Sequence, residues 1–130
     1  MKLQAKNHIE HLQLIRRRRM EKIFLEIDKI NVGKIELLAL ISKTSSEVVF
    51  YCDINGKTVQ SNNLIEEGLL DSVKLESFYS AVTTIIRSDS KFNANKMNIV
   101  KINKNNEISF TYDEINCRIY GIKKEWKNSL

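Results

Sequence analysis

The side chains that could act in catalysis or hold a metal ion are few, and the only two histidines stand close together near the N-terminus. His8 and His11 are three positions apart, so on a helix they would share one face and could bind a metal ion weakly. Other metal ligands are scarce around them, and two solvated histidines are the interpretation that we favour. The sequence therefore predicts no metal site.

The two cysteines do not form a recognisable site either. Cys52 and Cys117 lack the short spacing of metal-binding pairs. Cys52 ends an apolar stretch and is expected to be a small buried side chain. Cys117 could pair with it only if the fold brought the two together. Two cysteines are too few for a disulfide scaffold, and we expect a reduced, cytoplasmic protein.

The rest of the chain shows no familiar catalytic motif. Residues 20–130 hold no histidine, and the sequence has no phosphate loop, dinucleotide-binding fingerprint, nucleophile elbow or zincin motif. We therefore expect a protein that is not an enzyme, with no catalytic residues and no cofactor.

Four consecutive arginines, Arg16, Arg17, Arg18 and Arg19, are the sharpest local feature. At 3.6 residues per turn they would spread over roughly 300–400° of a helix, so they cannot form one binding stripe. A solvated basic arm is the favoured interpretation. A contact with nucleic acid or with an acidic partner remains an alternative.

This arm carries the whole charge excess of the chain. The formal net charge is +5, from 21 basic and 16 acidic residues. Residues 1–19 hold six of the basic residues and one acid, Glu10, so fifteen of each sign remain in residues 20–130. The contrast predicts a basic N-terminal arm, residues 1–19, followed by a single domain, residues 20–130.

Acidic residues gather near the middle of the chain, where segment 64–76 has a net charge of −3. The acids are Glu66, Glu67, Asp71 and Glu76. Acids near the start of a helix are favoured by the helix dipole, so capping and solvation are one explanation. The functional alternative is a patch that docks a basic protein, such as a nuclease. A lysine-rich stretch at 91–104 is the rival site and would suit an acidic partner.

Size and composition fit one globular domain. The chain has 130 residues, of which 42% are hydrophobic and 28% are charged, and this excludes disorder of the whole chain. No apolar run comes near the ~18 residues that a membrane-spanning helix needs. No apolar stretch of signal-peptide length follows the arginines, so we expect neither a membrane segment nor a secretory signal.

Hydrophobic periodicity predicts the order of helices and strands. Amphipathic helices are expected over 8–30 and 71–87, the second capped by Asp71 or Ser72 and with Val73 on its apolar stripe. Asn55-Gly56 predicts a tight hairpin. Residues 64–70 are expected to hold a short helix, whereas 115–126 is ambiguous because Gly121 weakens its helical pattern. The expected strands are 34–42, 47–52, 57–60, 97–103 and 107–112.

The resulting order, α-β-β-β-α-β-β-α, predicts an α+β fold. We expect an antiparallel sheet of about five strands with helices packed mainly on one face. Most aromatic residues should be core, and any tyrosine or tryptophan that lies exposed would be a candidate contact. The expected core comprises Phe24, Ile27, Ile35, Leu37, Val49, Phe78, Val82, Ile85, Ile99, Phe110 and Ile119.

Several of these elements together carry a family resemblance. They are the first amphipathic helix, the hairpin strand Glu47-Val-Val-Phe-Tyr51, helix 71–87, the late strand Ile108-Ser-Phe-Thr-Tyr-Asp113, and Arg118 and Trp126 in the closing segment. In this order, over about residues 20–127, the chain resembles the bacterial immunity proteins of polymorphic toxin systems. The similarity is greatest to those paired with contact-dependent growth inhibition toxins.

The resemblance implies a cytoplasmic antitoxin that inhibits stoichiometrically. Such a protein binds the C-terminal domain of a cognate secreted toxin, often a nuclease, by protein–protein interaction. The expected partner is thus a protein, held by the acids of segment 64–76; nucleic acid and membranes are not the expected partners. The alternative function is a nucleic-acid-binding accessory protein that uses Arg16 to Arg19. A third hypothesis is that the chain is a subunit of a larger assembly. Because the specificity of such inhibitors resides in their surface residues, the sequence does not identify the toxin.

Overall fold

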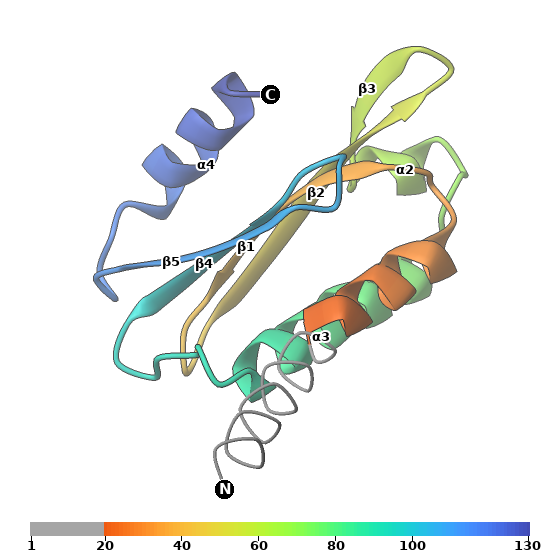
Figure 1. Ribbon diagram of the computed structural model, residues 1–130. Helices are drawn as coiled ribbons and strands as arrows, with labels where there is room; N and C mark the ends of the chain where they lie inside the picture. Colours follow the sequence, from red (N-terminus) through yellow and green to blue (C-terminus); the bar gives the residue numbers. More distant parts are fainter. Residues whose placement is uncertain (1–19) are drawn as a thin grey trace, which may run out of the picture.

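A five-stranded antiparallel sheet organises residues 20–130, the part of the chain that the computed structural model describes (Figure 1). The strands lie in the spatial order β3-β2-β1-β4-β5. They are β1 (Ile35–Ile41), β2 (Ser46–Ile54), β3 (Lys57–Gln60), β4 (Met97–Ile102) and β5 (Ile108–Asp113). The helices are residues 20–30, α2 (Asn63–Glu66), α3 (Ser72–Ser88) and α4 (Ile119–Asn128). The predicted α+β class, antiparallel sheet and element order are confirmed.

The central strand β1 is apolar on both sides because helices cover both faces of the sheet. Its neighbours β2 and β4 both pair with it in antiparallel register. Leu37 and Ala39 belong to the larger core cluster on one face, and Leu38 and Leu40 belong to the cluster on the other. This two-sided burial explains why the strand does not alternate between apolar and polar residues.

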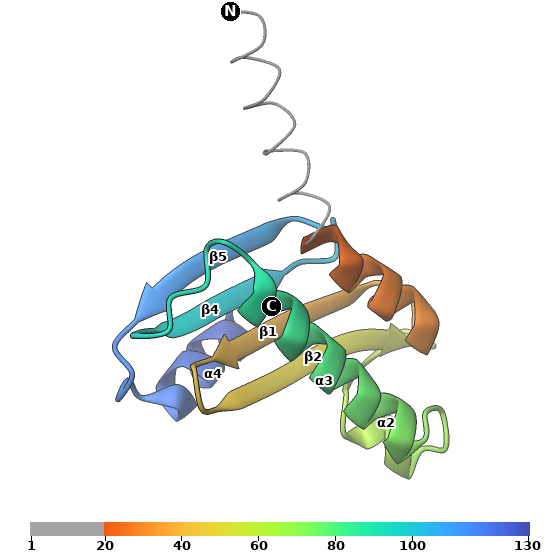
Figure 2. The same ribbon diagram turned by 90° about the horizontal axis from the view of Figure 1, so that it is seen from below.

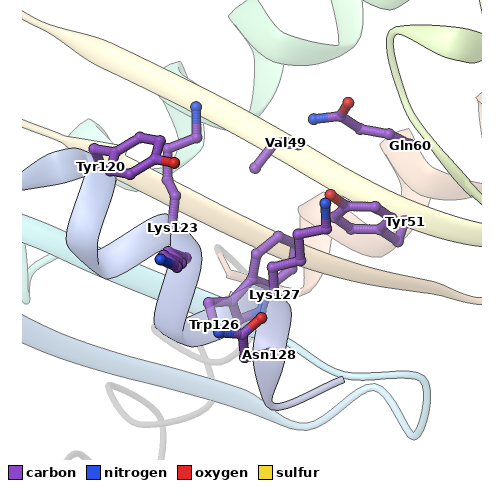
Figure 3. Close-up of a pocket in the computed structure, with 9 residues that line it drawn as sticks. Val49, Tyr51, Gln60, Tyr120, Lys123, Trp126, Lys127 and Asn128 are labelled. Atoms are coloured by element: carbon purple, nitrogen blue, oxygen red, sulfur yellow. The ribbon is translucent and has the colours of Figure 1, made fainter.

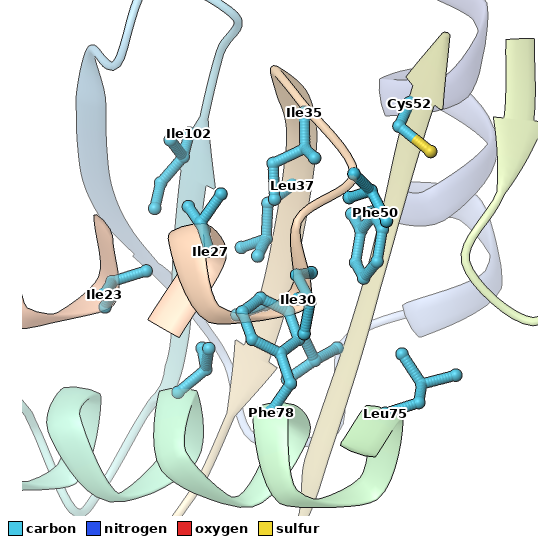
Figure 4. Packing of buried hydrophobic residues seen from close by; sticks show 14 of the residues in the cluster. Ile23, Ile27, Ile30, Ile35, Leu37, Phe50, Cys52, Leu75, Phe78 and Ile102 are labelled. Atoms are coloured by element: carbon cyan, nitrogen blue, oxygen red, sulfur yellow. The ribbon is translucent and has the colours of Figure 1, made fainter. Parts of the chain in front are cut away.

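Helix 20–30 and α3 cover the first face of the sheet, as both views show (Figures 1 and 2). Ile23 and Ile27 reach from the helix to the sheet, and Phe78 of α3 meets Phe50 of β2 edge-on at a ring separation of 5.4 Å (Figure 4). Edge-to-face aromatic pairs add to the stabilisation that comes from burying apolar area. The main core therefore lies between these two helices and the sheet.

Within residues 20–130, helix α4 alone covers the second face (Figure 1). Trp126, which is 5% exposed, packs on a smaller cluster that includes Leu38, Leu40 and Val49, and its ring lies 5.5 Å from that of Tyr51. The ambiguous segment 115–126 thus becomes a helix that starts at Ile119, with Gly121 inside it. A single short helix cannot cover the whole face, and hollows remain beside it.

The predicted core is confirmed at its centre and needs correction at its margins. Phe24, Ile85, Phe110 and Ile119 are only half-buried, because they lie at the edges of the helices or on the edge strand β5. Val73, expected on the apolar stripe of α3, is 71% exposed. The remaining predicted core residues are buried: Ile27, Ile35, Leu37, Val49, Phe78, Val82 and Ile99.

The hairpin between β2 and β3 forms where predicted. Asn55 and Gly56 both have positive φ, 52° and 80°, as a two-residue type I′ turn requires. Cys52 pairs with Val59 and Asp53 with Thr58 across it, which fixes the register of β3.

Within residues 20–130, no helix combines the length and the apolar character that crossing a bilayer would demand.

Candidate functional site

The acids singled out in the sequence lie around a compact turn between α2 and the start of α3, at one end of the molecule (Figure 2). The backbone amides of Leu69 and Leu70 both donate to the carbonyl of Leu64, at 2.9 and 3.3 Å. Gly68 permits the reversal because its φ is +71°, a region that glycine adopts without steric cost. Leu64 and Leu70 are buried and anchor the turn to the core.

A hydrogen bond also ties α3 to the segment between β3 and α2. The hydroxyl of Tyr79 donates to Oγ of Ser61 at 2.6 Å, and Ser61 is completely buried. Burial raises the pKa of Tyr79 above its usual value, although the bond to Ser61 opposes the shift. The acids are therefore presented on a well-supported scaffold, which is where binding residues commonly occur.

Asp71 has a structural role that its three companions lack. It is the N-cap of α3, and its carboxylate accepts a hydrogen bond from the backbone amide of Lys74 at 2.8 Å. Of the two predicted caps, Asp71 rather than Ser72 is the one used. This is the capping explanation foreseen for acids near a helix start, and it applies to this residue alone.

The other three acids, Glu66, Glu67 and Glu76, are exposed, and none forms an ion pair with another residue of the range 20–130. Glu66 ends α2, Glu67 follows it, and Glu76 lies in the second turn of α3. Their charges are free to act on a partner. The nearby charge of Glu67 also contributes to a raised pKa at Cys52, after burial and the charge of Asp53.

Exposed apolar side chains are interspersed among these acids. Ile65, Leu69 and Val73 are 38%, 49% and 71% exposed. We define the acidic–apolar surface as the exposed acidic and large apolar residues of this turn and helix start: Ile65, Glu66, Glu67, Leu69, Asp71, Val73 and Glu76. Apolar residues surrounded by charged ones are typical of protein-binding surfaces.

The rival lysines are not brought together. Lys96 and Lys104 lie beyond opposite ends of β4, a strand of six residues that spans about 17–20 Å. Each forms an ion pair, Lys96 with Glu114 at 2.8 Å and Lys104 with Asp53 at 2.6 Å. Through its hydrogen bond and charge, Lys104 lowers the pKa of Asp53. Lysine stretch 91–104 is therefore a sequence cluster and not a single surface.

The two cysteines and the other possible metal ligands are not brought together either. Cys52 lies in the main core, whereas Cys117 packs against the cluster under α4 on the opposite face, so they do not pair. Burial raises the pKa of both thiols. Residues 20–130 contain no group of three metal-ligating side chains. His8, His11 and the four arginines from Arg16 to Arg19 lie outside the described residues.

No protein-family model matches the sequence, and no curated protein matches it with significant similarity.

Sequence reasoning found the acids of this surface but missed its apolar members. Ile65 and Leu69 lie in a short segment that was expected only to be helical, and Val73 was placed on the apolar stripe of helix 71–87. The sequence did carry a signal for them. Segment 64–75 contains more apolar residues than one short turn can bury, so some of them had to be exposed. Lys123, Lys124 and Lys127 of α4 were also not singled out, since they gather only when the closing segment is helical.

Proposed function

We propose that the chain is an immunity protein, a stoichiometric inhibitor that binds a toxin domain of basic surface charge. The toxin would be a nuclease, and the inhibitor itself would have no catalytic activity. The observation that carries this proposal is the acidic–apolar surface, where three exposed apolar residues stand among three acids that have no ion-pair partner within residues 20–130.

Apolar and charged residues serve different parts of such an interaction. Exposed Leu69 and Val73 supply area whose removal from water favours association, at about 25 cal/mol per Å². Glu66, Glu67 and Glu76 supply long-range attraction that speeds encounter and orients the partner. A mixed surface of this kind suits a protein partner better than a small molecule, which would need a concave site.

The charge of the surface favours a partner that binds nucleic acid. A nuclease holds phosphates with lysines and arginines, so its active-site surface is basic. An acidic surface can cover that region and compete with the substrate through the same electrostatic attraction. This supports inhibition in which the chain covers the active site of the toxin. Such inhibition requires one inhibitor molecule for each toxin molecule.

The proposal is tested with the C-terminal domain of the protein encoded immediately upstream of this chain's gene. Expression of that domain alone should arrest bacterial growth, and coexpression of the 130-residue chain should restore it. The purified pair should form a complex of one to one, and nucleic acid cleavage should stop at equimolar inhibitor. Growth arrest that persists despite a soluble, folded chain, with no complex, would contradict the proposal.

A further inference from the structure

A second feature of the molecule is the hollow between α4 and strands β2 and β3, which the proposed function does not use (Figure 3). It has a volume of about 350 Å³, within the range of small-molecule sites. Val49, Tyr51 and Trp126 line its apolar part. Figure 3 shows Tyr120 and Lys123 on one side of the hollow and Tyr51 and Lys127 on the other.

The charged lining is entirely positive. Lys123, Lys124 and Lys127 contribute to it, and no aspartate or glutamate does. Lys123 is held by Glu47 at 2.5 Å, but Lys124 and Lys127 have no ion-pair partner among residues 20–130. Lys124 and Lys127 are three positions apart on α4, so they are neighbours on the helix surface. A bound anion would reduce the repulsion between these two charges.

The uncharged lining points to a planar, hydrogen-bonding group. Tyr120 is 78% exposed, the largest exposed fraction among the large hydrophobic side chains of residues 20–130, and Tyr51 lines the same hollow. Aromatic rings stack on nucleobases whatever the base. The side-chain amides of Gln60 and Asn128 carry both donors and acceptors, which the edge of a base requires.

We propose that this hollow binds a nucleoside phosphate, either as a free mononucleotide or as one nucleotide of a single strand. The phosphate lies against Lys124 and Lys127, and the base stacks on Tyr120. An acidic peptide would satisfy the lysines but would leave the tyrosines and amides without a matching group. Inorganic phosphate has no ring to stack on the tyrosines and no base edge to match the amides. The proposal is independent of the toxin-binding function.

Trp126 provides the readout, because it is the only tryptophan and lines the hollow. Its fluorescence is followed in the full chain during titration with AMP, ribose 5-phosphate or a short oligodeoxyadenylate, at low salt. AMP should bind saturably and about tenfold tighter than ribose 5-phosphate, which lacks the base. Tyr120→Ala should remove most of that difference. Lys124→Ala/Lys127→Ala should weaken AMP binding about tenfold.

Two control variants separate this site from general attraction to a basic protein. Lys22→Ala/Lys29→Ala removes the same charge from exposed positions of helix 20–30, on the opposite face, and should leave AMP affinity within about twofold. Replacing Arg16 to Arg19 by alanine tests the N-terminal arm and should also preserve AMP binding. Circular dichroism verifies that every variant is folded.

The outcomes decide the proposal and the form of the ligand. An oligonucleotide that binds much more tightly than AMP indicates a strand, and equal affinities indicate a free nucleotide; both support the proposal. Absence of saturable AMP binding overturns it. So does equal affinity for AMP and ribose 5-phosphate, or equal weakening by the α4 and the control lysine variants. Loss of AMP binding in the arginine variant alone overturns it as well.

Discussion

At the scale of single residues, the buried side chain of Asn98 connects two segments that are distant in the sequence. It is completely buried at the start of β4, and the two hydrogens of its Nδ2 are shared among the carbonyls of Ile41, Asn93 and Lys96, at 3.0, 2.9 and 3.1 Å from the nitrogen. Its Oδ1 accepts from the backbone amide of Asn93 at 2.8 Å. One side chain thus joins the end of β1 to the loop that follows α3.

Asn98→Ala should therefore lower the free energy of unfolding by about 2–4 kcal/mol, because it leaves buried carbonyls without donors. Denaturant unfolding measures the effect. Asn105→Ala, at an exposed position of the turn between β4 and β5, is the matched control and should change stability by less than about 0.5 kcal/mol. Similar values for the two variants would contradict the structural role of Asn98.

The two thiols should differ in reactivity because only one of them is fully enclosed. A disulfide-exchange reagent should modify Cys117, which is half-buried, before Cys52, which has no exposed surface. Burial raises the pKa of both thiols, so both should react slowly at neutral pH and faster as the pH rises, since the thiolate is the nucleophile. Equal rates in the native protein, assigned with Cys52→Ala and Cys117→Ser, would contradict this.

The raised pKa of the Cys52 thiol also makes the free energy of unfolding depend on pH. The folded state favours the neutral thiol of Cys52, so this contribution is complete below the ordinary thiol pKa of 9.0. It is lost progressively as the pH rises from that value toward the raised one in the folded protein.

At the scale of elements, substitutions of Asp71, the N-cap of α3, distinguish its structural role as a cap from the effect of its charge. Asp71→Ala removes the acceptor for the amide of Lys74 and should cost about 1 kcal/mol of stability. Asp71→Ser removes the same charge but retains a capping oxygen, so it should be nearly neutral. Thermal unfolding of the two variants measures the difference, and equal destabilisation would show that the charge rather than the cap is responsible.

Helix α4 carries a residue that weakens it without evident structural need. A Cβ added at Gly121 would meet only Cβ of Arg118, at the ordinary contact distance of 3.7 Å, and the φ of Gly121 is not positive. Gly121→Ala should therefore stabilise the protein by about 0.5–1 kcal/mol. Gly56→Ala is the contrasting control: it should destabilise, because φ there is +80°. Destabilisation by Gly121→Ala would contradict this assignment of the helix.

Local sequence signals predicted the order of the elements, but they left the conformation of segment 115–126, which contains most of α4, ambiguous. Alternation, apolar runs and Asn55-Gly56 are local properties, so they predicted the strands and the hairpin. Helix α4 is short and contains glycine, and its position depends on Trp126 packing beside Tyr51 of β2, a contact distant in sequence. Periodicity cannot report such a contact, so the second covered face was not foreseen.

The candidate surface divides in the same way. Charge is visible in a sequence, so Glu66, Glu67 and Glu76 could be selected from composition alone. Exposure is a tertiary property, and Val73 fits the spacing of the core-facing stripe although no neighbour among residues 20–130 covers it. The lysines 91–104 show the opposite error, because proximity in sequence was undone by an extended strand between them.

At the scale of the whole molecule, charge is segregated onto different parts of a nearly neutral body. The acidic–apolar surface lies at the α2–α3 end, and the lysines of α4 lie on the opposite face of the sheet from α3 (Figure 1). Partners of opposite charge can thus be distinguished by position. Reversal of charge at one site should leave the other site's ligand unaffected, so the two proposals can fail separately.

The decisive prediction at this scale concerns association with the toxin domain. Glu66→Lys, Glu67→Lys and Glu76→Lys are combined in one variant, and Asp71 is kept because its reversal would also remove the cap of α3. Association should slow by at least about tenfold at low salt, and the difference from the wild-type chain should shrink as salt screens the charges. Stopped-flow binding measures both quantities. The matched control, Glu21→Lys with Asp28→Lys and Glu107→Lys, makes the same charge change at exposed positions elsewhere. Equal slowing in both variants would mean that net charge, and not the acidic–apolar surface, governs the encounter.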